Sequence, residues 1–328
     1  MALKDNIDYW KISLQNPELP GEELYTRDRV IIDQNHYRRT VDRLRELIIA
    51  YCVMSELERN CNIKNEILKL IDELIISTPN MQYTEFLAYW KCMDMTYIVY
   101  KELDEQHRFT VLETLLHRYC ERRRELYDRF GYTHVIQQAL YDSTSARSQG
   151  AKGVQKVQQI LKQVIGSELP RVRTASDFQA QHLCVFLPDG NKDEFGNWTQ
   201  QQNVQYSFGK THQGKLPDIL IKIGSIVFVL EAKHIKERGG AQDKQIKELI
   251  DFIEQKEETA SIHYVAFLDG VYFNLFCEPI EGTKPYKQRK AIKKALRKFK
   301  QNYFVNTAGL RELLRDAYNS EFPEGSCA

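Results

Sequence analysis

The chain has 328 residues, of which 42% are hydrophobic, and this is enough to bury the core of one large domain or two smaller ones. Lys and Arg total 46 against 45 Asp and Glu, so the net charge of +1 gives no sign of a nucleic-acid partner, and such a sign must come from local clustering. The N-terminus lacks an apolar segment of signal-peptide length, and no run of about 18 uncharged apolar residues occurs. We therefore expect an intracellular protein with no membrane partner.

The first part of the chain has a helical pattern. Between Gly21 and Gly131 there is no glycine and a single proline, Pro79, and apolar residues recur at three- and four-residue spacing. This pattern predicts helices that include residues 41–51 and 63–74, and two more over about 83–103 and 107–129. We therefore expect residues 1–142 to form an α-helical region that serves recognition or dimerisation.

The seven cysteines show no functional pattern. Their number is odd, and none forms a Cys-x-x-Cys pair. This disfavours both a zinc cluster and a disulfide framework. We expect buried or unreactive thiols.

Glycines and β-branched runs return from about residue 150, after a polar connector at 143–150. The pattern predicts a second domain over 143–328, with a helix at 151–165, a long loop at 189–215 and a helix after the glycines at 239–240. An Asp-Gly pair at 269–270 predicts a hairpin between strands at 262–268 and 271–276. We expect an α/β fold with a mixed central sheet flanked by helices.

The most informative segment is LPDILIKIGSIVFVLEAK at 216–233, which has two β-branched runs around a Gly-Ser pair. Gly followed by a small polar residue favours a two-residue type II′ turn at 224–225. Counting outward from this turn places Asp218 opposite Glu231, with Cβ atoms about 5 Å apart. Because side chains alternate along a strand, Lys233 lies on the same face as Glu231.

Two carboxylates at this distance repel each other unless a cation lies between them, and the flanking apolar strands lower the local dielectric. Oxygen ligands with room for water and phosphate match Mg²⁺, which uses one or two protein carboxylates. The simpler alternative is a surface hairpin on which the lysine forms an ion pair with one of the acids.

Pro217-Asp218, the twelve-residue gap and Glu231-Ala232-Lys233 resemble the PD-(D/E)xK nuclease superfamily, in particular type II restriction endonucleases. The match covers about 145–276. The resemblance implies that Asp218, Glu231 and the carbonyl of Ala232 bind Mg²⁺, while Lys233 orients or activates the attacking water. It also implies a restriction-endonuclease-like core in which a mixed sheet is flanked by helices.

An enzyme of this kind hydrolyses both strands of double-stranded DNA at a specific short sequence, in the cytoplasm of a prokaryotic cell. We expect a homodimer, because a two-fold enzyme addresses two strands symmetrically. Two alternatives stay open. One is a nuclease of the same superfamily for DNA repair, junction resolution or modification-dependent cutting, and the other is a non-catalytic DNA-binding module.

Two glutamines are possible supporting residues. Gln155 lies where many restriction enzymes have a glutamate in their first core helix, and its amide oxygen can orient water but brings no charge. Gln245 lies near the start of the helix after residue 240, where it could contact the DNA backbone or water at the metal. A solvated helix position explains either residue equally well.

A basic segment follows at 284–300, where nine Lys or Arg residues occur without Asp or Glu and are interleaved with apolar residues. This pattern predicts a helix whose cations bind the DNA backbone without reading sequence. A solvated helix face and a membrane-surface helix are the alternatives. The candidate backbone contacts are Lys290, Lys293, Lys294 and Arg297.

Overall fold

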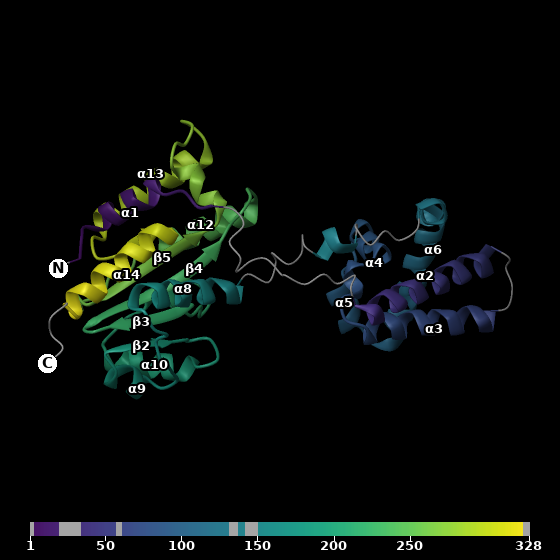
Figure 1. Cartoon of the computed structure of the whole chain (residues 1–328), viewed down its shortest axis with the longest axis horizontal. Coiled ribbons are helices and arrows are strands. Elements are labelled where there is room, and N and C mark those ends of the chain that lie inside the picture. The colour runs from purple at the N-terminus through teal and green to yellow at the C-terminus, as the bar shows by residue number, and fades with distance from the viewer. Residues whose placement is uncertain (1–2, 20–33, 57–60, 131–136, 142–149, 324–328) are drawn as a thin grey trace. The chain divides into compact units, whose positions relative to one another are not determined.

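The computed structural model in Figure 1 describes residues 3–19, 34–56, 61–130, 137–141 and 150–323. The chain forms two compact units: Thr26–Arg147, here the helical unit, and Met1–Tyr25 together with Ser148–Ala328, here the sheet unit. The expected helical region began at residue 1, whereas the described residues 3–19 belong to the sheet unit. The expected connector at 143–149 lies outside the described residues.

The helical unit has its own apolar core. The expected helix over 83–103 is divided, because Asp94 has a left-handed backbone conformation with φ of 55° that ends the first part, and Thr96 caps the next helix. The other three expected helices are present. The helices of this unit are α2 (Asn35–Glu56), α3 (Cys61–Ser77), η3 (Met81–Tyr83), α4 (Glu85–Trp90), η4 (Lys91–Met93), α5 (Tyr97–Glu102) and α6 (Glu105–Phe130).

Cys52 of α2 and Cys120 of α6 form a disulfide, so the expectation of free thiols is wrong for this pair. The two residues are 68 positions apart, and only the packing of α2 against α6 brings them together. Local cysteine spacing therefore could not reveal the bond. Cys92, Cys184 and Cys277 are free.

The sheet unit is built on six strands in the order β1-β2-β3-β4-β5-β6. The β2–β3 and β3–β4 pairs are antiparallel, and the β1–β2, β4–β5 and β5–β6 pairs are parallel. The expected mixed sheet flanked by helices is confirmed at this level (Figure 1). The strands are β1 (Arg171–Val172), β2 (Leu183–Phe186), β3 (Ile219–Ile223), β4 (Ile226–His234), β5 (Ile262–Asp269) and β6 (Tyr303–Val305).

Helices cover both faces of this sheet. On one face, here the α8 face, alternate apolar residues of β3 and β4 pack with α8, α14 and Tyr9 of α1. The other residues of the strands face α12, α13 and the shorter helices, and we call this side the α12 face. The helices are α1 (Asn6–Gln15), α8 (Gly150–Ile165), α9 (Ala175–Ala180), α10 (Lys192–Gln201), α11 (Ser207–Thr211), α12 (Gly240–Ile253), η5 (Val271–Phe276), α13 (Lys284–Lys298) and α14 (Thr307–Glu321).

Helix α1 joins the sheet unit through contacts with the far end of the chain. The hydroxyl of Tyr9 donates to Asp316 of α14, 307 positions later. The amide of Asn6 donates to the carbonyls of Leu296, Phe299 and Asn302, around the end of α13. These hydrogen bonds, most of them buried, explain why α1 does not belong to the helical unit.

Two expectations for the sheet unit are wrong. The segment 189–215 is not a structureless loop but contains α10 and α11, because Phe195, Trp198 and Phe208 bury their rings in the core. The expected strand 271–276 is the 3₁₀ helix η5, which buries three aromatic rings against Trp10 and α13. The parallel strand β6 pairs with β5 instead of a hairpin partner.

The predicted hairpin is confirmed in its register and its turn. Ile223 pairs with Ile226, and Ile219 pairs with Leu230. A type II′ turn requires a positive φ at the first of its two central residues and not at the second. Gly224 has φ of 60°, and Ser225 does not have a positive φ, so the turn matches this type. Of the helices in the described ranges, none is long and apolar enough to cross a membrane.

Candidate active site

The hairpin brings the two predicted acids to the same place. The N–H of Asp218 donates to the carbonyl of Leu230 at 3.0 Å, but the register pairs Leu230 with Ile219, so the regular pairing of β3 with β4 ends at Ile219 and Asp218 lies just before it. Glu231 alternates with Val227 and Val229, which face α12, so its side chain lies on the α12 face, and Oδ2 of Asp218 accepts from the N–H of Ala232, the next residue. The negative charge of Glu231 acts on Asp218, which places the two carboxyl groups near each other.

Asp218 sits in an environment that disfavours its charge. Burial raises the pKa of its carboxyl group to about 6, and the negative charge of Glu231 contributes to the increase. The backbone N–H of Ala232 opposes this effect by donating to Oδ2 of Asp218 at 2.7 Å. A cation between the two acids would relieve their repulsion.

Glu231 is completely buried, and its two oxygens have different surroundings. Its Oε1 accepts hydrogen bonds from Nζ of Lys233 and Nζ of Lys215, each at 2.5 Å. Its Oε2 is buried and has no hydrogen-bond partner among the residues that the structure describes. A buried carboxylate oxygen without a partner is costly, and a ligand at this position would remove the cost.

The sequence interpretation missed Lys215 and Glu248. Lys215 precedes β3 and forms an ion pair with Glu248, which lies on α12, and Glu248 is also 3.8 Å from Lys233. Both contacts depend on how the chain before β3 and helix α12 fold back over the sheet. A basic residue three positions before Asp218 is the only local signal, and it is a weak one.

The two lysines differ in how firmly they hold their protons. Burial by itself would lower the pKa of Lys233, but the attraction of Glu231 outweighs it and the pKa is raised. The pKa of Lys215 is lowered, because burial and the positive charge of Lys233 outweigh the attraction of Glu231. Lys233 is therefore the more firmly charged of the two.

Tyr206 is a further polar group of this region that the sequence did not indicate. Its hydroxyl is buried and has no hydrogen-bond partner within the described ranges. Burial raises its pKa, and the negative charges of Glu231 and Asp218 raise it further. The hydroxyl therefore lies within the electric field of both acids.

These residues fit a magnesium ion. The described residues contain no group of three or more His, Cys, Asp or Glu that could hold a metal. Magnesium, however, is usually held by one or two carboxylates and keeps several waters. Asp218 and the unpartnered Oε2 of Glu231 could supply such a pair, and these are the two carboxylates among the three expected ligands.

The other predicted residues lie elsewhere. Gln155 is exposed on α8, which covers the face of the sheet opposite to the α12 face. The close approach of α8 to that face shows in Gly153, where an added Cβ would lie 3.2 Å from Cβ of Ala232. Gln245 is half-buried on α12, where Glu248 is the residue that contacts the site. The four candidate backbone contacts on α13 are all exposed.

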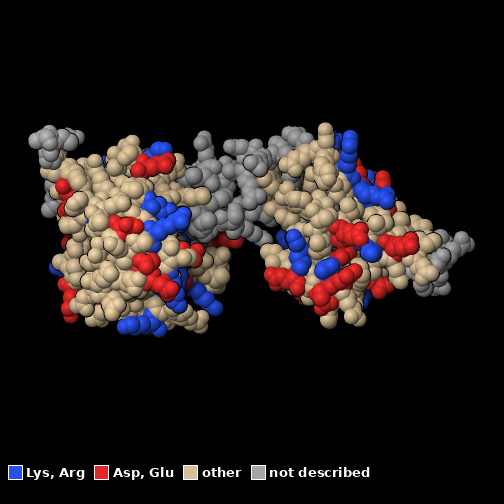
Figure 2. All heavy atoms as spheres, turned by 90° about the horizontal axis from the view of Figure 1, so that it is seen from below, with Lys and Arg blue, Asp and Glu red and all other residues tan. Residues whose placement is uncertain are grey.

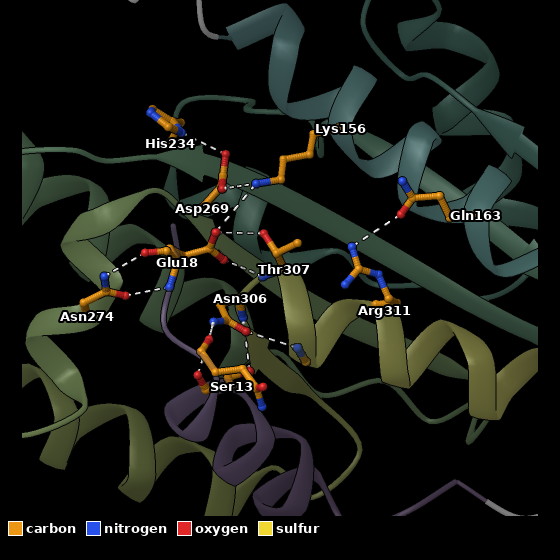
Figure 3. A network of polar contacts seen from close by, with 12 residues as sticks. Ser13, Glu18, Lys156, Gln163, His234, Asp269, Asn274, Asn306, Thr307 and Arg311 are labelled. Atoms are coloured by element: carbon orange, nitrogen blue, oxygen red, sulfur yellow. Dashed lines mark hydrogen bonds and ion pairs between the residues drawn. The ribbon is translucent and has the colours of Figure 1, made fainter. Parts of the chain in front are cut away.

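A second cluster of buried charges supports the ends of β4 and β5 on the α8 face (Figure 3). Asp269 contacts Nζ of Lys156 at 2.5 Å and Nδ1 of His234 at 2.8 Å. Glu18 lies 3.6 Å from Lys156 and accepts from the backbone and hydroxyl of Thr307 at 2.7 and 3.0 Å. Since His234 follows Lys233, this cluster fixes the strand that carries the site.

Comparisons of the chain with protein-family models, with curated protein sequences and with solved structures found no match. What the chain does is therefore inferred from the geometry and the charges of its own residues.

Proposed function

We propose that this chain is a magnesium-dependent endodeoxyribonuclease of the PD-(D/E)xK superfamily. It cuts double-stranded DNA at a specific short sequence, as a type II restriction endonuclease does. The observation that carries the proposal is the meeting of Asp218, Glu231 and Lys233 on one hairpin, with a buried oxygen of Glu231 that has no partner. The mixed sheet flanked by helices also supports it.

The chemistry of phosphodiester hydrolysis suits this arrangement. A bound magnesium ion supplies positive charge to the phosphate and makes water easier to deprotonate. Asp218 and Glu231 hold the ion, and the ammonium group of Lys233 orients the attacking water and offsets charge that develops on the phosphate. The hydrogen bond from Lys233 to Glu231 fixes the ammonium group in that position.

The partner is DNA, and α13 supports this part of the proposal. We define the α13 basic face as Lys290, Lys293, Lys294 and Arg297. All four are exposed, and within the described ranges none forms an ion pair with a carboxylate, whereas Lys284 of the same helix pairs with Asp243. Exposed cations without an ion pair to a carboxylate are available for phosphates.

The α13 basic face is also on the appropriate side of the sheet. Helix α13 packs beside α12 over the face that carries Glu231. Figure 2 shows another face of the molecule, on which Lys and Arg are mixed with Asp and Glu in both units. A surface of mixed charge attracts a polyanion less than a helix with cations alone.

We further propose that the enzyme is a homodimer in the cytoplasm of a prokaryotic cell. A two-fold arrangement of two centres would address both strands of DNA symmetrically.

Digestion of defined plasmid DNA with and without magnesium, followed by sequencing of the ends, tests the function. We expect defined cuts with the wild-type chain that disappear in Asp218→Ala and in Lys233→Ala, while DNA binding survives. Lys236→Ala is a matched control, because Lys236 is exposed just after β4. Unchanged cutting by both site variants would refute the nuclease proposal.

The same digestion separates the restriction enzyme from its alternatives. A discrete set of fragments from unmethylated plasmid supports a restriction endonuclease. Cutting only of methylated, damaged or branched DNA would indicate a modification-dependent, repair or junction-resolving nuclease. Binding without any cutting would indicate a DNA-binding module.

A further inference from the structure

Lys215 reaches into the site from the segment that directly precedes the hairpin. Its Nζ lies 2.5 Å from Oε1 of Glu231 and also pairs with Glu248 of α12. The side chain of Lys215 is 30% exposed, whereas that of Glu231 is not exposed at all. The ammonium group therefore lies between the buried acid and the open side of the site.

The charges of the site favour a role for this second cation. Lys215 and Lys233 both donate to one oxygen of Glu231, and two ammonium groups so close together repel each other. A hairpin that needed only to neutralise Glu231 would be served by Lys233 alone. An incoming phosphate group, which is negative, would share the two ammonium groups and reduce their repulsion.

The backbone around Lys215 is held in place. Its N–H donates to the carbonyl of His212 at 3.0 Å, and the N–H of Gly214 donates to the carbonyl of Gly209 at 2.8 Å. The ring of Phe208, which is buried, lies 6.0 Å from the ammonium group. A fixed backbone reduces the entropy that the lysine loses when it binds a phosphate.

We propose that Lys215 is a second substrate-contacting cation of the site, which binds the DNA phosphate together with Lys233, and that Glu248 is the residue that positions it. This inference rests on the proposed nuclease function. An ammonium group has three donors, and only two carboxylate oxygens contact that of Lys215 within the described residues, so one donor can face a phosphate.

The test compares the wild-type chain with Lys215→Met, Lys215→Arg and Glu248→Gln. The control is Lys210→Met, which removes an exposed lysine from nearby α11. DNA affinity is measured with Ca²⁺, and the single-turnover cleavage rate is measured with Mg²⁺. We expect Lys215→Met to slow cleavage by about 100-fold, the usual effect of losing one donor to a developing charge, and to weaken DNA binding.

Two further results are expected. Lys215→Arg should recover cleavage to within about tenfold of the wild type, because it keeps the charge. Lys215→Met should bind Mn²⁺ more tightly than the wild type in a titration followed by electron paramagnetic resonance, because a positive charge beside Glu231 is lost. A variant that merely disrupted the fold would bind Mn²⁺ more weakly.

The outcomes separate this inference from the nuclease proposal. If Lys215→Met binds and cuts DNA as the Lys210→Met control does, or binds Mn²⁺ more weakly than the wild type, the inference is overturned and the nuclease proposal stands. If the wild type does not cut, but its DNA binding with Ca²⁺ is lost in Lys215→Met alone, the nuclease proposal fails and the Lys215 contact is supported.

Discussion

Replacing Asp218 with asparagine is expected to stabilise the sheet unit at neutral and alkaline pH. Burial and the charge of Glu231 raise the pKa of Asp218 from 3.8 to about 6. Because the folded-state pKa lies above the unfolded-state value, the stability is complete below pH 3.8, falls as the pH rises to about 6, and is constant above. At about 1.4 kcal/mol for each pKa unit, the ionised carboxylate costs about 3 kcal/mol of unfolding free energy.

Asparagine removes this cost and keeps an oxygen that can accept from the N–H of Ala232. Urea unfolding in the presence of a chelator, from pH 4 to pH 8, measures the difference. A Trp90→Phe background leaves Trp10 and Trp198, both buried in the sheet unit, as the fluorescence probes. We expect Asp218→Asn and wild type to be nearly equal at pH 4, and the variant to be more stable by about 3 kcal/mol at pH 8.

Asp189→Asn is the control, because Asp189 is exposed in the same unit and its replacement relieves no burial of a carboxyl group. The reasoning is refuted if Asp218→Asn is less stable than the wild type at pH 8, or if its gain is the same at pH 4. Adding Mg²⁺ at pH 8 should stabilise the wild type and not the variant, because only the wild type keeps both acids that would hold the ion.

Three other perturbations test different parts of the structure. Changing all four residues of the α13 basic face to glutamine should reduce the slope of log affinity against log salt by about 4, in DNA titrations at several salt concentrations; an unchanged slope would exclude phosphate contacts there. Gly153→Val should destabilise the sheet unit by about 1–3 kcal/mol in urea, because its side chain would press against Ala232; equal stability would contradict that close contact. Reducing the Cys52–Cys120 disulfide should lower the stability of the helical unit by about 4 kcal/mol and leave the sheet unit unchanged in calorimetry; a shift in both units would argue against their independence.

The hairpin could be predicted from the sequence because its geometry is local. A two-residue turn fixes the register from Ile223 and Ile226 out to Ile219 and Leu230, and this brings Asp218 and Glu231 to the same end of the hairpin. Alternation along the strand then puts Lys233 beside Glu231. None of these steps requires knowledge of residues far away in the chain.

Lys215 and Glu248 could not be predicted in the same way. Their contact depends on how α12 lies over the sheet and how the segment after α11 returns to β3. Both are set by packing between residues far apart in sequence. The site is therefore larger than its motif.

The segment 271–276 shows how tertiary contacts can override a local pattern. Its aromatic and β-branched residues suit a strand. In a strand, alternate side chains would point to opposite faces, whereas η5 buries Tyr272, Phe273 and Phe276 in one cluster. Burial of three large rings outweighs the preference of the backbone.

The contacts of α1 have a consequence for the order in which the protein folds during synthesis. The buried hydrogen bond of Tyr9 can form only after Asp316 has been synthesised. The core of the helical unit, in contrast, lies within one continuous stretch of chain. Domains generally fold as units while the chain is being made. On the ribosome the helical unit can therefore fold first, and the sheet unit is completed only after α14 has emerged, so the proposed cutting centre is among the last parts of the protein to be assembled.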